Sequence, residues 1–240
     1  MNDKTNHKLD KKIRVKSDDH IWHLHEYDVD LQSNHIYLMG MEQFTTGQEE
    51  SIGEPGVEYS MANRFIRNLN LCMRSNPEKA IVIHMKTCGG DWTEGMAIYD
   101  AIKSCPVPVT ILNYTHARSM SSLIFQAANK RVMMPHSYFM YHHGTLAYEG
   151  NVRTVFSTVE FDKLATKAML NIYADSMEQN GKFKGKPRKT ILAYLNRRME
   201  KKDDVFLTAQ ETVDLGLADY VFDYNWAQLV EYTKEELERG

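Results

Sequence analysis

Two short apolar runs, each followed by a small-residue turn and a helical pattern, constrain the fold of this chain most. Residues 80–85 read AIVIHM and residues 109–114 read VTILNY. Runs this apolar are typical of strands buried on both faces, which occur mainly in parallel sheets. Strand and helix alternate here with short connections, which predicts an α/β fold with right-handed crossovers.

The other periodicities extend this pattern along the chain. We expect a strand or ordered extension at 20–30 and strands at 35–40, 131–134, 137–142 and 219–223. Ser60 is the expected N-cap of the first helix, and further helices are predicted at 93–102, 119–130, 191–200 and 208–215. The segments 42–59 and 181–189 read as loops, the second of them basic and solvated.

One predicted helix is longer than the rest of the domain requires. Apolar residues keep a helical period from Asn151 to Gln179, which corresponds to roughly 40 Å at ~1.5 Å per residue. A core of this size cannot cover such a length. The sequence therefore predicts that one end of this helix packs on another subunit.

Composition narrows the class of protein. The chain has 240 residues, and 29 Lys+Arg against 32 Asp+Glu give a net charge of −3, which offers no electrostatic reason to expect nucleic acid as a partner. No run reaches the ~20 apolar residues of a transmembrane helix. Three cysteines without CxxC spacing favour a reducing compartment, and we expect a cytoplasmic protein. The expected organisation is a mobile arm at 1–19, one domain at 20–224 and a charged C-terminal helix at 225–240.

Three places could carry chemistry. Gly89-Gly90 follows the first buried run, where glycines let backbone N–H groups face a ligand; a simple tight turn is the alternative. Ser119 follows the second run at the start of a helix, where it is either a nucleophile or only a cap. His142 and His143 close a later strand. A serine, a histidine and a carboxylate brought together would suit acyl transfer.

Longer motifs identify a family. They are NPEKAIVIHM at 76–85, GGDWTEGMAIYDAI at 89–102, the Ser119-Met120 pair, PHSYFMYHHGTLAYEG from Pro135, and FLTAQETVDLGLADYV at 206–221. From about His35 to Tyr224 the chain resembles the ClpP family, the serine-peptidase subunits of the Clp protease. The resemblance implies stacked βαβ units, as in the ClpP and crotonase folds, with a long protruding handle helix.

The resemblance also implies roles for particular residues. Ser119 is similar to the family's nucleophile and His142 to its general base, while the backbone N–H groups of Gly90 and Met120 correspond to the oxyanion hole. Counting back from Phe206 without a gap, the catalytic aspartate falls on Glu200, with Asp203 and Asp204 close enough to be rivals. No cofactor or metal is implied, and His20, His23 and His25 read as a surface cluster.

Several positions depart from the family pattern. Thr87-Cys88 stands where the family has Ser-Pro, Arg118 replaces a small residue before the nucleophile, and Ser121 replaces a glycine. The segment 42–59 reads as an insertion. These departures bear on the shape and specificity of the pocket.

The expected function is a serine endopeptidase that cleaves unfolded polypeptides inside a homo-oligomeric chamber. The resemblance implies heptameric rings that stack as a tetradecamer and an ATP-driven AAA+ unfoldase as partner, with no role for nucleic acid or membrane. Alternatives are a phage head maturation protease acting on capsid and scaffold proteins, an inactive structural subunit of a mixed ring, and an acyl-CoA hydratase or isomerase of the related crotonase fold.

Overall fold

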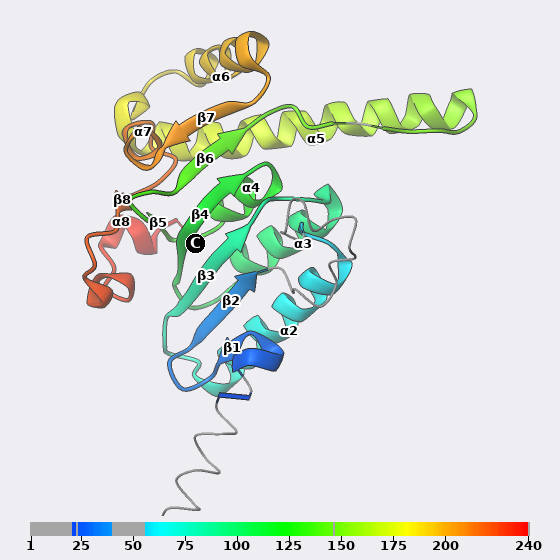
Figure 1. The fold of residues 1–240 in the computed structure, drawn as a ribbon. Helices are drawn as coiled ribbons and strands as arrows, with labels where there is room; N and C mark the ends of the chain where they lie inside the picture. The colour runs from blue at the N-terminus through cyan, green and yellow to red at the C-terminus, as the bar shows by residue number, and fades with distance from the viewer. Residues whose placement is uncertain (1–20, 23, 40–55, 146, 240) are drawn as a thin grey trace, which may run out of the picture.

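The central feature of the molecule is one mostly parallel sheet (Figure 1). The computed structural model describes residues 21–22, 24–39, 56–145 and 147–239, so the predicted arm at 1–19 and nearly all of the 42–59 loop lie outside the described residues. The strands are β1 (Val29–Asp30), β2 (His35–Met39), β3 (Ile81–Thr87), β4 (Val109–Arg118), β5 (Lys130–Met133), β6 (Tyr138–Tyr141), β7 (Val205–Thr208) and β8 (Tyr220–Val221). The main path runs β1-β2-β3-β4-β5-β8, antiparallel only at β1–β2. The α/β prediction is confirmed.

Strand β4 changes partner along its length. Its first half pairs with β5, as in Thr110 opposite Lys130, and its second half pairs with β6, as in Ala117 opposite Phe139. β4 therefore continues four residues past the predicted end at Tyr114. This fork brings the end of β4 next to the end of β6.

Strand β7 was absent from the sequence prediction. It pairs antiparallel with β6 and alternates buried Val205 and Leu207 with exposed Phe206 and Thr208. That alternation is a strand signal. It spans only four residues, directly between two helical patterns.

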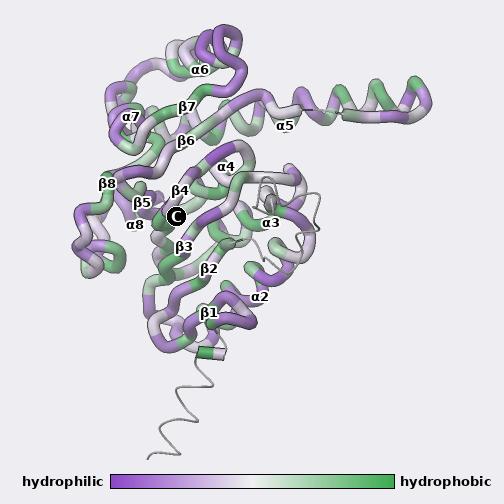
Figure 2. The backbone as a smooth tube through the Cα atoms, viewed as in Figure 1, coloured by the Kyte–Doolittle hydropathy of each residue, from purple (hydrophilic) through white to green (hydrophobic). Residues whose placement is uncertain are grey.

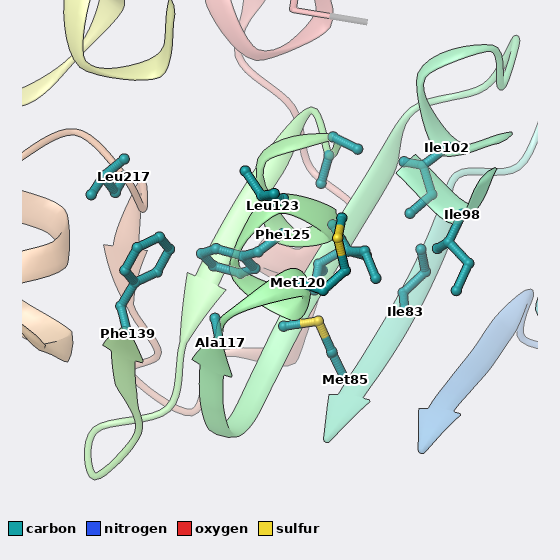
Figure 3. Packing of buried hydrophobic residues seen from close by; sticks show 14 of the residues in the cluster. Ile83, Met85, Ile98, Ile102, Ala117, Met120, Leu123, Phe125, Phe139 and Leu217 are labelled. Carbon is teal, nitrogen blue, oxygen red and sulfur yellow. The ribbon is translucent and has the colours of Figure 1, made fainter. Parts of the chain in front are cut away.

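Helices α2 (Tyr59–Ser75), α3 (Trp92–Lys103) and α4 (Met120–Gln126) pack together against the sheet (Figure 1). The main core lies between them and the strands, with Ile83 and Met85 of β3 facing Ile98 of α3 and Leu123 of α4 (Figure 3). α4 ends four residues earlier than predicted, because Lys130 already begins β5.

Two N-terminal predictions are wrong in detail. Glu58, not Ser60, caps α2: its carboxylate accepts hydrogen bonds from the backbone N–H groups of Ser60 and Met61. Residues 21–22 and 24–27 are helical rather than extended, and only Val29–Asp30 of that segment form a strand.

The C-terminal segment lies against the far side of the sheet. It covers a second apolar cluster of Val82, Leu112, Val132, Phe222 and Leu229. The predicted helix at 225–240 is instead a 3-10 turn, η3 (Trp226–Leu229), followed by a short α8 (Lys234–Leu237).

Helix α5 (Val152–Gln179) extends well beyond the rest of the molecule (Figure 1). Its second half is anchored in the core through Met169, Tyr173, Ala174 and Met177, beside α6 (Arg188–Lys202). η2 (Gly181–Phe183) precedes α6, and α7 (Ala209–Asp214) follows β7.

The protruding half of α5 carries recurring apolar residues (Figure 2). Val152, Phe156 and Leu164 are 65–69% exposed. The predicted long helix is confirmed in position and length. No helix in the described ranges is long and apolar enough to cross a bilayer.

Candidate active site

Ser119 sits on a strained turn between β4 and α4. Its backbone has φ 53° and ψ −129°, a conformation that costs a non-glycine residue about 1–3 kcal/mol and persists only where its surroundings enforce it. The Ser119 N–H donates to the Met140 carbonyl (3.0 Å), and the Ser122 N–H donates to the Ser119 carbonyl (3.0 Å). A sharp strand-to-helix turn of this kind presents a serine hydroxyl at the edge of a sheet.

His142 lies directly after β6 and reaches Ser119. Because β6 runs parallel to β4 with Arg118 opposite Met140, His142 emerges at the same edge as the turn that carries Ser119. Its Nε2 is 2.8 Å from Ser119 Oγ. The structure thus brings together the serine and histidine that the sequence singled out.

The carboxylate beside His142 belongs to Asp204. His142 Nδ1 is 3.0 Å from Asp204 Oδ1, with the two side chains 21% and 47% exposed. The antiparallel register of β6 and β7 explains this contact: Tyr141 pairs with Val205, so the next residues outward, His142 and Asp204, face each other. With Asp204 accepting from Nδ1–H, Nε2 is left free to accept the Ser119 proton.

Glu200, the aspartate equivalent chosen by gap-free counting, is not brought to the histidine. It lies on the exposed side of the last turns of α6, next to buried Met199. Asp203 ends α6 with φ +57°. Gap-free counting therefore did not select the carboxylate that contacts His142: the chain leaves α6 by a sharp turn at Asp203, and the pairing of the unpredicted strand β7 with β6 places Asp204, just before β7, beside the histidine.

Gly89-Gly90 form a turn packed tightly against Ser119. Gly89 has φ +94°, and a Cβ there would lie 2.8 Å from Ser119 Cβ and 2.9 Å from the Met120 nitrogen. The bonds on either side of Gly90 both go to Val57: Val57 N–H donates to Gly89 O (2.6 Å), and Asp91 N–H donates to Val57 O (2.9 Å).

This bridge sets the direction of the Gly90 N–H. The Gly89 C=O and the Gly90 N–H belong to one trans peptide unit, in which the two groups point in opposite directions. Because Gly89 O faces Val57, the Gly90 N–H points away from Val57. Met120 begins α4, where N–H groups have no partner within the helix. Val57 itself was not predicted; it lies in the segment interpreted as an inserted loop, and no local pattern marks it.

A cleft of about 560 Å³ opens beside these groups. Gly90, Ser119, Met120, Leu123 and His142 line it. It is also lined by one face of α5, which contributes Thr158, Phe161, Asp162, Ala165, Thr166, Met169 and Tyr173. An extended peptide could lie in such a cleft with a carbonyl next to the Ser119 hydroxyl.

A buried tyrosine of α5 supports the turn that carries Ser119. The Tyr173 hydroxyl donates to Ser122 Oγ (2.6 Å), and Ser122 Oγ donates to the Ser119 carbonyl (2.5 Å). Burial raises the pKa of Tyr173 far above its usual value, so this tyrosine stays neutral and keeps its proton for the contact.

In the described part of the chain, no group of three or more His, Cys, Asp or Glu side chains could hold a metal ion.

The fold and the site together define a class: an α/β protein in which a serine on a strained turn faces a histidine and a carboxylate supplied by neighbouring strands. Comparison with known families makes this specific. The sequence profile of the Clp protease family matches residues 50–225, and the chain belongs to that family of peptidases. It is 30% identical over 174 residues to the ATP-dependent Clp protease proteolytic subunit of Deinococcus radiodurans, covering 72% of this chain and 78% of the relative.

Proposed function

We propose that this protein is a serine endopeptidase in which Ser119 is the nucleophile, His142 the general base and Asp204 the orienting carboxylate. The observation that carries the proposal is the continuous contact from Ser119 Oγ to His142 Nε2 (2.8 Å) and from His142 Nδ1 to Asp204 Oδ1 (3.0 Å). A serine hydroxyl becomes a useful nucleophile when a neutral imidazole can take its proton.

The reaction follows from these contacts. Ser119 Oγ attacks the carbonyl carbon of the scissile peptide bond while His142 Nε2 takes the hydroxyl proton. The negative oxygen of the tetrahedral adduct accepts hydrogen bonds from the N–H groups of Gly90 and Met120. His142 then gives its proton to the leaving amine, which breaks the C–N bond and leaves an acyl ester on Ser119. Water, deprotonated by His142, hydrolyses that ester.

The carboxylate contributes by holding His142 in place. Asp204 accepts the Nδ1 proton, which fixes the productive tautomer and stabilises the imidazolium formed during attack. The contact of an aspartate with His142 supports an active peptidase over an inactive structural subunit.

The proposed substrate is unfolded polypeptide, cleaved within a homo-oligomeric chamber. The exposed apolar half of α5 supports this assembly, because apolar area of that extent is more stable when a neighbouring subunit covers it. We propose heptameric rings stacked in pairs, as the family resemblance implies. The relative is named an ATP-dependent proteolytic subunit, which supports an ATP-driven unfoldase as the partner.

An active-site probe tests this proposal. The purified protein is treated with a fluorophosphonate, and the adduct is mapped by peptide mass spectrometry. Labelling is expected at Ser119 and should be lost in Ser119→Ala and in His142→Ala. His136→Ala is the matched control, since His136 is exposed on a turn away from the cleft, and it should label like the parent. Absence of labelling at Ser119 in assembled parent protein would overturn the proposal.

A further inference from the structure

Three of the departures from the family pattern meet at one place in the structure. Cys88 precedes the glycine turn, while Arg118 and Ser121 flank the nucleophile turn. Arg118 Nε donates to the Cys88 carbonyl at 3.2 Å. Ser121 Oγ lies 2.8 Å from the Thr87 carbonyl, and it also accepts from the Arg118 N–H at 2.9 Å.

These hydrogen bonds lie where the pairing of β3 with β4 is irregular. Met85 pairs with Asn113, but the next pair along β3 and β4 is Thr87 with Ala117, so the register slips between them. Such an irregularity interrupts the regular ladder of hydrogen bonds. The Ser121 hydroxyl is fully buried there, and its single proton is shared between the carbonyls of Thr87 and Arg118, at 2.8 and 2.7 Å.

As a result, each of the three backbone carbonyls that precede Gly90 accepts a hydrogen bond. Thr87 O accepts from Ser121 and Cys88 O accepts from Arg118, while Gly89 O accepts from the Val57 N–H. Rotation of the Gly89–Gly90 peptide would turn the Gly90 N–H from its present direction, which is away from Val57. Holding the two preceding peptide units opposes that rotation.

The residue at position 88 explains why the turn needs these hydrogen bonds. A proline at position 88 would restrict its own φ to about −65° and stiffen the turn from within. Cys88 imposes no such restriction, so restraint must come from outside the turn. Arg118 and Ser121 supply it from the same segment that carries Ser119, which links the position of the nucleophile to the position of the oxyanion donors.

We propose that Arg118 and Ser121 form a clamp that positions the Gly90 N–H for the transition state, and that they act as positioning residues rather than catalytic ones. The inference rests on the proposed peptidase function. Its specific consequence is that loss of the clamp impairs the stabilisation of the tetrahedral oxyanion more than the binding of the substrate.

The test is Ser121→Ala, with Arg118→Met as a second variant that keeps the length of the side chain but removes the donor. We expect kcat for a fluorogenic peptide to fall about 10- to 100-fold, as misplaced catalytic groups generally cause, while KM changes less than threefold. Affinity for a peptidyl boronate, which mimics the tetrahedral adduct, should fall in the same proportion as kcat.

Thr110→Val is the matched control. Thr110 is a fully buried hydroxyl on the same strand as Arg118, but it bonds to the Leu229 carbonyl (2.6 Å) and the Tyr232 hydroxyl (2.7 Å), away from the cleft. Removing it should lower stability and leave kcat within twofold. If Ser121→Ala behaves like Thr110→Val, the clamp is refuted.

Amide hydrogen exchange gives a readout that does not depend on activity. Exchange in a peptide covering residues 86–92 should be faster in Ser121→Ala than in the parent and unchanged in Thr110→Val. Unchanged exchange in Ser121→Ala overturns the clamp. If exchange is faster in Ser121→Ala but a fluorophosphonate never labels the parent protein, the peptidase proposal is refuted and the clamp is retained.

Discussion

Replacing Asp204 by asparagine should distinguish it from Glu200 and Asp203, the two other carboxylates that the sequence offered for this role. Asp204→Asn removes the charge 3.0 Å from His142 Nδ1 with almost no change in shape. At that distance, the attraction between a carboxylate and an imidazolium is about 1.4 kcal/mol in water and about 5.5 kcal/mol at an effective dielectric of about 20. The side chains are 21% and 47% exposed, which places the pair between these limits, at about 3 kcal/mol.

This energy corresponds to a fall in kcat of about a hundredfold. The amide makes the effect larger if it donates to Nδ1, because that selects the unproductive tautomer of His142. The assay is steady-state hydrolysis of a fluorogenic peptide together with the rate of fluorophosphonate labelling at Ser119. KM should change little, since Asp204 acts on His142 rather than on the substrate.

Two controls match the perturbation. Asp203→Asn makes the identical chemical change one residue away, at a position with φ +57° that asparagine tolerates. Glu200→Gln removes the charge that gap-free counting selected. Both variants should keep kcat within threefold of the parent. A hundredfold loss in Glu200→Gln, or parent-like kcat in Asp204→Asn, would refute the assignment of the carboxylate.

Three further outcomes are expected. Gly90→Ala should abolish labelling at Ser119, because its Cβ would collide with the backbone of Val57, whereas Gly185→Ala, with open space around its Cβ, should label normally. Burial and the neighbouring His35 lower the pKa of His84 from 6.5 to about 4. Between these pH values the unfolded chain binds a proton at His84 that the folded chain does not. The free energy of unfolding should therefore fall by up to about 3 kcal/mol as the pH drops from about 6.5 to about 4. Urea unfolding at several pH values should show this slope in the parent and its loss in His84→Gln. Phe156→Asp on the exposed face of α5 should shift the protein to smaller species in analytical ultracentrifugation, and Lys163→Glu on the same helix should not; a parent that sediments as a monomer would contradict the proposed assembly.

The sequence predicted the parts of the site that depend on local pattern. The buried runs at 80–85 and 109–114 lie within β3 and β4, and the turns that follow these strands carry Gly90 and Ser119. His142 follows from the motif that starts at Pro135. In each case, the candidate site residue lies within a few positions of a strand that has a clear apolar pattern.

The parts that failed depend on pairing between distant segments. Asp204 reaches His142 only through the register of β6 and β7, and a four-residue strand leaves too weak a signal to fix that register. Val57 contacts Gly90 from a segment with no regular pattern at all. Local periodicity cannot report which strands become neighbours, so these contacts appear only in the folded chain.

The pairing of β6 with β7 also makes the contact between His142 and Asp204 independent of the length of the segment between them. Everything between residues 143 and 203 leaves the sheet after His142 and returns to it at Asp204, and the register fixes both ends of that excursion. Whole helical turns in α5, or residues in the 181–189 segment, can be gained or lost without moving the histidine relative to its carboxylate. In the proposed assembly, the part of α5 that would meet other subunits could therefore change in length without altering the contact between His142 and Asp204.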